Sequence, residues 1–165
     1  MSDIAIMTDS NCGIMPGCEP CPDIHIIPMP VLIDGETFYE GKSITADSFY
    51  RQLASDAAVS TSLPSPGDVM DMWTSLLRDY REVVDIPMSS GLSTSCASAL
   101  ALASDGDFGG RVHVVDNHRI SVTQTQSVLD ACALAEEGKT GRQIKEQLER
   151  EALDASIYIA VDTLK

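Results

Sequence analysis

The sequence predicts an α/β domain with a mainly parallel sheet flanked by helices, and three observations support that prediction. Short apolar runs rich in β-branched residues are bounded by Gly, Pro, Asp, Asn or Ser, as buried strands usually are. Segments whose apolar residues recur with helical spacing lie between these runs. Strand and helix therefore alternate, and 165 residues with 44% hydrophobic content suit a single domain over residues 1–165.

Five apolar runs are the candidate strands. Each is short, rich in Val and Ile, and bounded by residues that favour turns. These runs are Ile4–Met7, Ile24–Leu32, Val83–Met88, Val112–Val115 and Ile157–Val161. The turn at Ile33–Glu36 also predicts a tight hairpin that joins Pro30–Leu32 to Thr37–Tyr39 as a small antiparallel addition.

Helices are expected between the runs, where apolar residues recur with helical spacing. The recurring residues are Phe49 and Leu53; Val69, Trp73, Leu76, Leu77 and Tyr80; Ala97, Leu100 and Ala101; Val128, Leu129, Cys132 and Leu134; and Ile144 and Leu148. Cap residues mark where three of these helices begin, namely Thr45, Ser65 with Pro66 after it, and Thr140. Gly138 closes the helix that precedes Thr140.

The charge and hydropathy of the chain disfavour two classes of partner. A formal net charge of −14 comes from 25 acidic and 11 basic residues, and no cluster of Lys or Arg could neutralise a row of phosphates. Nucleic acids and anionic membrane surfaces are therefore poor partners. No apolar run reaches the roughly 18 to 20 residues of a membrane span. Because Met1-Ser2-Asp3 also begins no signal peptide, we expect no membrane insertion and a cytoplasmic location.

Hydroxyl side chains gather next to the predicted strands, where ligands of an open parallel sheet bind. The segments are Thr8–Asn11 after the first strand, Ser60–Ser65 before the Trp73 helix, and Ser89–Ser95 after Val83–Met88. In Ser89–Ser95 the strand is expected to turn into a helix whose free N–H groups favour a carboxylate or phosphate. The alternative interpretation of both longer runs is that their hydroxyls only cap the next helix.

Six short motifs follow one another along the whole chain. They are Ile6-Met7-Thr8-Asp9-Ser10; Ile26-Ile27-Pro28 with Ile33-Asp34-Gly35 and Tyr39; Thr61-Ser62-Leu63-Pro64-Ser65-Pro66; Ser89-Ser90-Gly91-Leu92-Ser93; Val114-Val115-Asp116; and Val161-Asp162-Thr163-Leu164. In this order and spacing the chain resembles the DegV family. The third motif resembles the family's Thr-Ser-x-Pro-Ser loop, and the fourth resembles its Ser-Ser-x-Leu-Ser-Gly-Thr turn.

The resemblance implies a fold of the DegV and dihydroxyacetone-kinase type (the EDD fold) and a bound long-chain fatty acid. By position, Thr61 and Ser93 would hydrogen-bond the carboxylate. The residues that would support this pocket are Ser62, Ser90, Leu92, Thr94, Asp9 and Ser10. The resemblance further implies a carrier without catalysis, cofactor or metal, which presents the fatty acid to a separate fatty acid kinase subunit for phosphorylation.

The chain departs from the family pattern in three places. Thr94-Ser95 stand where the family has Gly-Thr, so the helix start is a place to expect a difference in shape. Glu40-Gly41 stand where many members have Asp-Gly, which keeps the charge. The family also continues past its Asp-Thr-Leu strand into a second domain, and the acyl chain is expected between the two. We therefore expect the first domain only, with half of the tunnel missing.

A serine hydrolase would need a histidine base beside one of these serines. The candidates are His25, His113 and His118. We expect His113 to be a partly exposed sheet residue and His118 to be able to reach the crevice. No Gly-x-Ser-x-Gly elbow is present, which disfavours this enzyme class.

Two binding functions remain as alternatives. Cys18-Glu19-Pro20-Cys21 has zinc-knuckle spacing, and Cys12 and His25 are possible further ligands. The simpler interpretation is a surface loop, and the five cysteines, an odd number, do not indicate a disulfide framework. The other alternative is a small anion-binding or phosphate-binding α/β domain that uses Ser89–Ser95, although the chain has neither Gly-x-Gly-x-x-Gly nor Gly-x-x-x-x-Gly-Lys.

Overall fold

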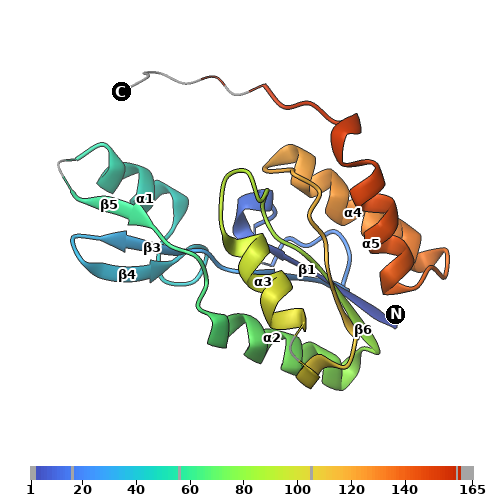
Figure 1. Ribbon diagram of the computed structural model, residues 1–165. Helices are drawn as coiled ribbons and strands as arrows, with labels where there is room; N and C mark the ends of the chain where they lie inside the picture. Colours follow the sequence, from blue (N-terminus) through green and yellow to red (C-terminus); the bar gives the residue numbers. More distant parts are fainter. Residues whose placement is uncertain (1–2, 16, 56, 105, 159, 161–165) are drawn as a thin grey trace.

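The centre of the fold is a four-stranded parallel sheet in the order β2-β1-β6-β7 (Figure 1). Its strands are β1 (Ile4–Asp9), β2 (Ile24–Ile27), β6 (Glu82–Ile86) and β7 (Val112–Val114), and every neighbouring pair runs parallel. The computed structural model describes residues 3–15, 17–55, 57–104, 106–158 and 160. The predicted α/β class with a mainly parallel sheet is confirmed.

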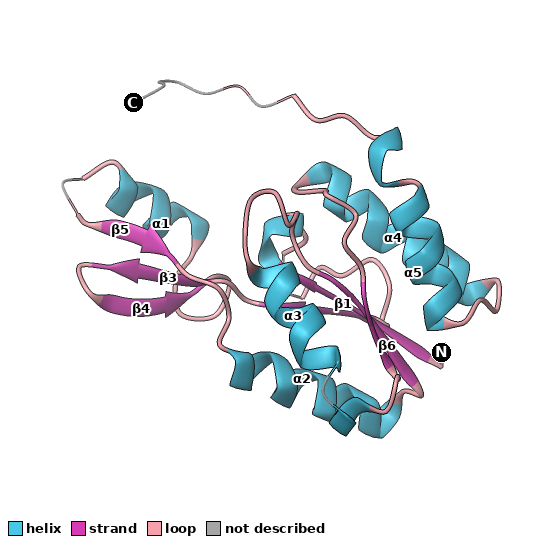
Figure 2. Ribbon diagram, viewed as in Figure 1, coloured by secondary structure: helices cyan, strands magenta, loops and turns pink. Residues whose placement is uncertain are grey.

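Helices cover both faces of this sheet (Figure 2). Side chains alternate between the faces along each strand, so Ile4 and Ile6 join one core cluster while Ala5 and Met7 join the other. The first cluster includes residues of α4 (Val122–Glu136) and α5 (Gly141–Arg150). The second includes residues of α2 (Pro66–Asp79) and α3 (Ser95–Ser104). Burial on both faces explains why the strands are almost continuously apolar.

A second, antiparallel sheet stands beside the first, in the order β4-β3-β5. Its strands are β3 (Pro30–Ile33), β4 (Glu36–Tyr39) and β5 (Val59–Thr61), and α1 (Ala46–Leu53) lies next to them (Figure 1). The predicted hairpin between β3 and β4 is confirmed. Its turn residues Asp34 and Gly35 have φ of 49° and 85°, the left-handed conformation that a tight two-residue hairpin requires. We call β3, β4, β5 and α1 the small module.

The two sheets correct two expectations. The run Ile24–Leu32 is not one strand, because the chain leaves β2 after Ile27, passes Pro28 and Met29, and enters β3 of the other sheet. Pro28 has no N–H to give to a strand ladder. The segment Ser60–Ser65 is not all loop, because β5 ends at Thr61. Three residues of mixed polarity are too few to show a strand pattern in the sequence.

The predicted helix caps are all present. The side chains of Thr45, Ser65 and Thr140 each accept a hydrogen bond from a backbone N–H in the first turn of the helix that follows. Thr140 also forms a reciprocal capping box with Gln143. Gly138 follows α4 with φ of 83°, as a closing glycine does. Short 3-10 turns complete the described chain at Ser10–Cys12, Gly106–Phe108 and Ala152–Asp154.

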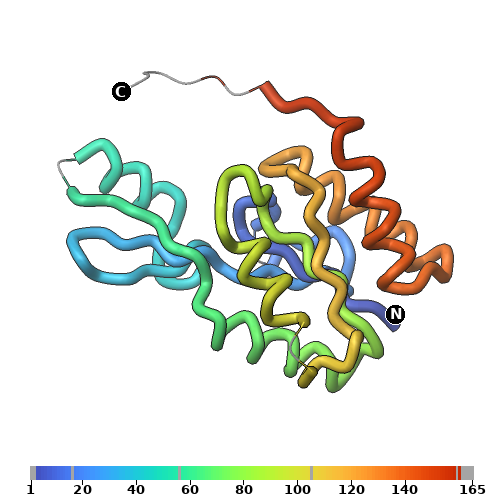
Figure 3. Tube along the Cα trace, in the orientation of Figure 1, coloured from blue at the N-terminus to red at the C-terminus, as the bar shows by residue number. Residues whose placement is uncertain are grey.

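The predicted strand at Ile157–Val161 is wrong for the residues that are described. Ile157, Tyr158 and Ala160 have no strand conformation, and residues 159 and 161 lie outside the described part. A strand needs a neighbour to bond its backbone groups, yet no described strand pairs with this segment, and Tyr158 is 97% exposed. Figure 3 shows residues 155–158 running clear of the helices.

Within the described residues, no helix has the length and apolar character needed to cross a bilayer.

Candidate functional site: a groove between the hydroxyl loops

A groove of about 680 Å³ runs between the small module and the loop that follows β6. This volume falls within the roughly 300 to 1,000 Å³ that is typical of small-molecule sites. Its lining is mixed, with apolar side chains in the majority. The lining residues are Asn11, Met15, Met29, Val31, Glu40, Ile44, Thr45, Ala46, Phe49, Tyr50, Thr61, Ser62, Leu63, Met88, Leu92, Ser93 and Thr94.

Five of the eight candidate residues line this groove. Thr61 and Ser62 reach it from the end of β5, and Leu92, Ser93 and Thr94 reach it from the turn between β6 and α3. The two hydroxyl runs are 30 residues apart and belong to different sheets. They come together because the carboxyl end of β6 faces the small module. Their role as ligands of a carboxylate stays a prediction.

The Ser93 hydroxyl is held at the start of α3. Its Oγ lies 2.8 Å from the Oγ of Ser95 and accepts a hydrogen bond from the Ser95 backbone N–H at 3.1 Å. Its own backbone N–H donates to the carbonyl of Ser89 at 3.1 Å. Ser95 stands at the position where the DegV family, which the sequence resembles, has threonine. A hydroxyl is therefore kept at this position. Ser93 is therefore fixed in place, with Ser95 as its neighbour.

Asp9, Ser10 and Ser90 are not among the residues that line the groove, and Ser90 is exposed beside His118. The Asp9 carboxylate accepts the backbone N–H of Met88 at 2.7 Å and that of Asn11 at 3.0 Å, which ties the end of β1 to the end of β6. Burial raises the pKa of Asp9, and these hydrogen bonds lower it in part. The Ser10 hydroxyl donates to Glu40 at 2.6 Å. Asp9 and Ser10 therefore position the loops.

The groove offers hydroxyls and one carboxylate but, among its described lining residues, no Lys or Arg. Glu40 is the charged side chain in the lining, and its Oε2 accepts from Ser10. An anionic head group in this groove would therefore be held by neutral donors. Hydroxyl donors orient a carboxylate by direction, whereas an ion pair would add a strong charge attraction.

The histidines do not form a hydrolase site. The Nδ1 of His118 lies 3.1 Å from the Ser90 Oγ and 3.6 Å from the Asp116 Oδ1. A catalytic triad needs the serine on one ring nitrogen and the carboxylate on the other, so two contacts on one nitrogen do not make a relay. The Nε2 of His25 lies 3.2 Å from the Tyr80 hydroxyl, and burial lowers the pKa of His25.

The expectation for His113 is wrong, because His113 is 8% exposed and not a partly exposed sheet residue. Its Nε2 lies 3.0 Å from the Glu82 carboxylate. A side-chain carbon on Gly141 would lie 2.3 Å from the His113 ring, so glycine is needed where α5 crosses it. The alternation of strand residues indicated exposure, but α5 covers that position.

The zinc ligands do not come together. Cys12 is fully buried in the core, Cys18 is exposed, and His25 contacts Tyr80. Across the described part of the chain, no three His, Cys, Asp or Glu side chains are grouped as a metal site requires. Cys21 packs on the core cluster that contains Cys12 and Cys132. The zinc-knuckle hypothesis is therefore not supported.

The DegV family profile, which describes uncharacterised proteins of that family, matches residues 3–165. This chain belongs to the DegV family. A DegV domain-containing protein from Deinococcus radiodurans is 33% identical to it over 162 residues, which cover 98% of this chain and 57% of that protein.

Solved DegV structures share the fold. A structure described as fatty acid binding of a DegV family protein from Thermus thermophilus has a TM-score of 0.79 at 29% identity, covering 92% of this chain and 54% of the other. DegV from Bacillus subtilis, described as a fatty acid binding protein, gives 0.79 at 28% identity with the same two coverages. A stearic-acid-binding protein from Eubacterium ventriosum gives 0.77 at 27%, covering 88% and 52%. The chain thus spans about half the length of these relatives.

Proposed function

We propose that this DegV chain binds a long-chain fatty acid, with the carboxylate hydrogen-bonded by Thr61 and Ser93. One observation carries the proposal, namely that two hydroxyl loops from different sheets line a single, largely apolar groove. Ser62, Leu92 and Thr94 complete the wall around the head group. The relatives described as fatty-acid-binding proteins support the choice of ligand.

The acyl chain and the carboxylate of the ligand contribute to binding in different ways. Burying an acyl chain contributes about 0.8 kcal/mol per methylene, which is offset in part by the cost of ordering both partners. Each hydroxyl contact to the carboxylate contributes roughly 1.5 to 3 kcal/mol. The tail therefore supplies most of the affinity, and the hydroxyls decide which way the ligand points.

The groove is open along one side, and we relate this opening to the greater length of the relatives. Met15, Tyr50 and Leu92 line it and are 50%, 65% and 61% exposed. A small-molecule site normally buries 70–90% of its ligand. We propose that the further length of the relatives, a second domain, closes this side, and that the chain alone binds fatty acid more weakly than a two-domain relative.

The proposed role in the cell is to present the carboxyl group to a fatty acid kinase subunit. A head group held by neutral hydroxyls is oriented without being neutralised by a cation, which suits transfer to a second protein. With a net charge of −14 on this chain, the kinase should dock through a basic surface. Association should then slow as salt rises past about 0.1 M, where the Debye length is about 10 Å.

Affinity measurements on matched variants test the head-group assignment. Thr61→Val and Ser93→Ala each remove one hydroxyl, and Ser75→Ala removes an exposed hydroxyl on α2 as a control. Titration of the fluorescent fatty acid cis-parinaric acid should show a loss of about tenfold for each groove variant and none for the control. Equal affinity in all four proteins would overturn the assignment, and absence of binding in the wild type would overturn the ligand.

A further inference from the structure

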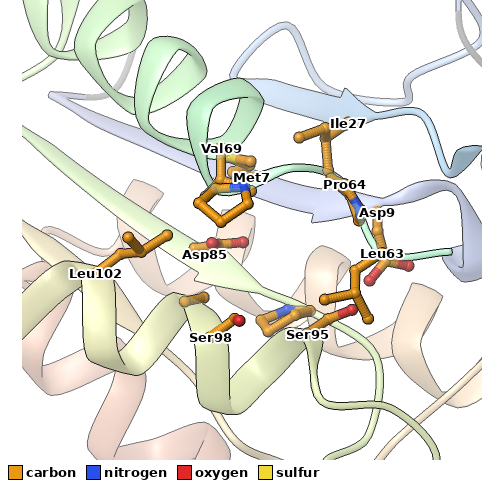
Figure 4. A pocket seen from close by; sticks show the side chains of 13 residues that line it. Met7, Asp9, Ile27, Leu63, Pro64, Val69, Asp85, Ser95, Ser98 and Leu102 are labelled. Atoms are coloured by element: carbon orange, nitrogen blue, oxygen red, sulfur yellow. The ribbon is translucent and has the colours of Figure 1, made fainter.

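A second, smaller cavity lies directly behind the hydroxyl loops. It has a volume of about 30 Å³, which is room for water. Figure 4 shows its wall, with Asp85 coming from β6, Ser95 and Ser98 from α3, and Leu63 from the loop after β5. Leu63 lines both this cavity and the groove. The cavity therefore sits behind the proposed head-group site.

Asp85 is the unusual residue in this wall, because it is a carboxyl group in the middle of a buried strand. It is 4% exposed, and its Oδ2 accepts a hydrogen bond from the Trp73 indole N–H at 3.2 Å. Two other titratable groups face it, Asp9 from β1 and Cys96 from α3. Both are acids, so neither neutralises a charge on Asp85.

Burial, and then the neighbouring Asp9, favour the neutral form of Asp85. The Asp9 carboxylate accepts hydrogen bonds from Met88, Asn11 and Gln124, which favour its ionised state and offset part of the rise that burial causes in its pKa. A second negative charge in the same buried region is unfavourable. Burial, and then the charge of Asp9, raise the pKa of Asp85 to about 7. Asp85 can therefore gain or lose its proton near neutral pH.

The Ser93–Ser95 hydrogen bond connects this cavity to the groove. The two Oγ atoms are 2.8 Å apart and either can donate. When Ser95 donates to Ser93, the single Ser93 proton is available to a ligand in the groove. When Ser93 donates to Ser95, that proton is used and the ligand meets only an acceptor. The direction of the Ser93–Ser95 hydrogen bond depends on whether the cavity offers Ser95 a hydrogen-bond donor or an acceptor.

We propose that the protonation state of Asp85 sets the direction of this hydroxyl pair and thereby couples ligand binding to pH. Neutral Asp85 donates its proton to a water in the cavity, the water donates to Ser95, and Ser95 donates to Ser93. Ser93 then donates to the ligand carboxylate. Ionised Asp85 accepts from the water, and its negative charge attracts the nearby hydroxyl protons, so Ser95 turns its proton toward the cavity and Ser93 donates to Ser95. The inference rests on the proposed fatty-acid function.

The sign of the effect follows from linkage. The ligand prefers the protonated protein, so binding takes up a proton and the affinity falls as pH rises through the range in which Asp85 ionises. If only the protonated form binds and ionisation is centred at about 7, the dissociation constant should rise about tenfold between pH 6 and pH 8.

Asp85→Asn is the decisive variant. The asparagine oxygen can accept from Trp73, and its amide group can donate into the cavity, as the neutral acid does. Ser95→Ala breaks the connection, and Asp71→Asn removes an exposed carboxylate from α2 as a control. Each protein is titrated with cis-parinaric acid from pH 6 to pH 8, and unfolding curves at each pH confirm that it is folded. Ionisation of the probe itself is common to all four proteins and cancels in the comparison.

We expect wild type and Asp71→Asn to lose about tenfold in affinity across this range, and Asp85→Asn to hold the pH 6 affinity at pH 8. Ser95→Ala should bind with the same affinity at pH 6 and pH 8, because Ser93 then has no Ser95 hydroxyl to which it can donate. The same pH dependence in wild type and Asp85→Asn would overturn the inference and leave the proposed function standing. No binding by wild type at any pH would overturn both.

Discussion

The two hydroxyls of the proposed site belong to regions of very different rigidity. Ser93 follows β6 of the parallel sheet, where β1 is buried along its whole length and helices pack on both faces. Thr61 ends β5 of the small module, where the hydrophobic cluster of the described residues has three buried members, Val31, Ile33 and Ile44, and where helix α1 has no buried residue. One hydroxyl is therefore held by a large core, while the other belongs to a unit with a small core, which we expect to be the less rigid region.

This difference would allow the proposed groove both to hold and to release a long ligand. Binding loops and lids come from the less stable parts of a protein, and here the small module forms one wall of the groove. Phe49 and Tyr50 of α1 line that wall and pack edge to face at 5.5 Å. Movement of the module would change the distance between Thr61 and Ser93 without disturbing the parallel sheet.

The largest effect is expected for Trp73→Ala in the scaffold. Trp73 is fully buried, its ring meets Phe108 at 5.1 Å, and its N–H bonds Asp85. Its loss should lower the free energy of unfolding by about 3 to 5 kcal/mol. Urea unfolding followed by circular dichroism measures this, and a loss below about 1 kcal/mol would show that the scaffold is not the rigid region.

Asp85→Asn should stabilise the scaffold at alkaline pH. The folded-state pKa of about 7 lies above the ordinary 3.8, so the folded protein binds the extra proton and wild type loses stability as pH rises between those values. The loss is about 1.4 kcal/mol per pH unit and is complete above pH 7. The variant should therefore gain on wild type from pH 5 to pH 8. If the free energies of unfolding of wild type and variant change with pH in the same way, Asp85 does not titrate between pH 5 and pH 8.

Much of the fold could be predicted because its signals are local. Buried parallel strands such as Ile4–Met7 are continuous apolar runs, and the caps at Thr45, Ser65 and Thr140 act on the residues that follow them. β5 could not be predicted, because it forms only by pairing with β3. The buried position of His113 depends on α5, which is equally remote in sequence.

The site could be predicted in part for the same reason. The hydroxyl runs that contain Thr61 and Ser93 are visible in the sequence, and motif resemblance selected those two residues. Met15 and Tyr50 also line the groove, but no pattern marks them, because only the folded module brings them there. Asp85 is a single polar residue within an apolar run, a signal that could have been recognised in the sequence.

A smaller effect is expected for Ile33→Ala in the small module, with Ile33→Val as the matched control. Ile33 is one of the three buried residues of the module's hydrophobic cluster, and its truncation should cost about 2 kcal/mol. Hydrogen exchange should quicken in β3 to β5 while β1 and β6 stay protected. Affinity for fatty acid should fall because Thr61 is displaced. Equal loss of protection in both sheets would refute the division into a rigid and a mobile region.

The central claim is that Thr61 and Ser93 hold the carboxylate, and carbon-13 NMR of palmitate labelled at its carboxyl carbon tests it most directly. The bound carboxyl resonance in wild type should differ from that of the free ligand. In the double variant Thr61→Val with Ser93→Ala, at ligand concentrations high enough to saturate the weaker site, that resonance should move toward the free value while the acyl chain still contacts the groove. An identical bound resonance in wild type and double variant would contradict the account.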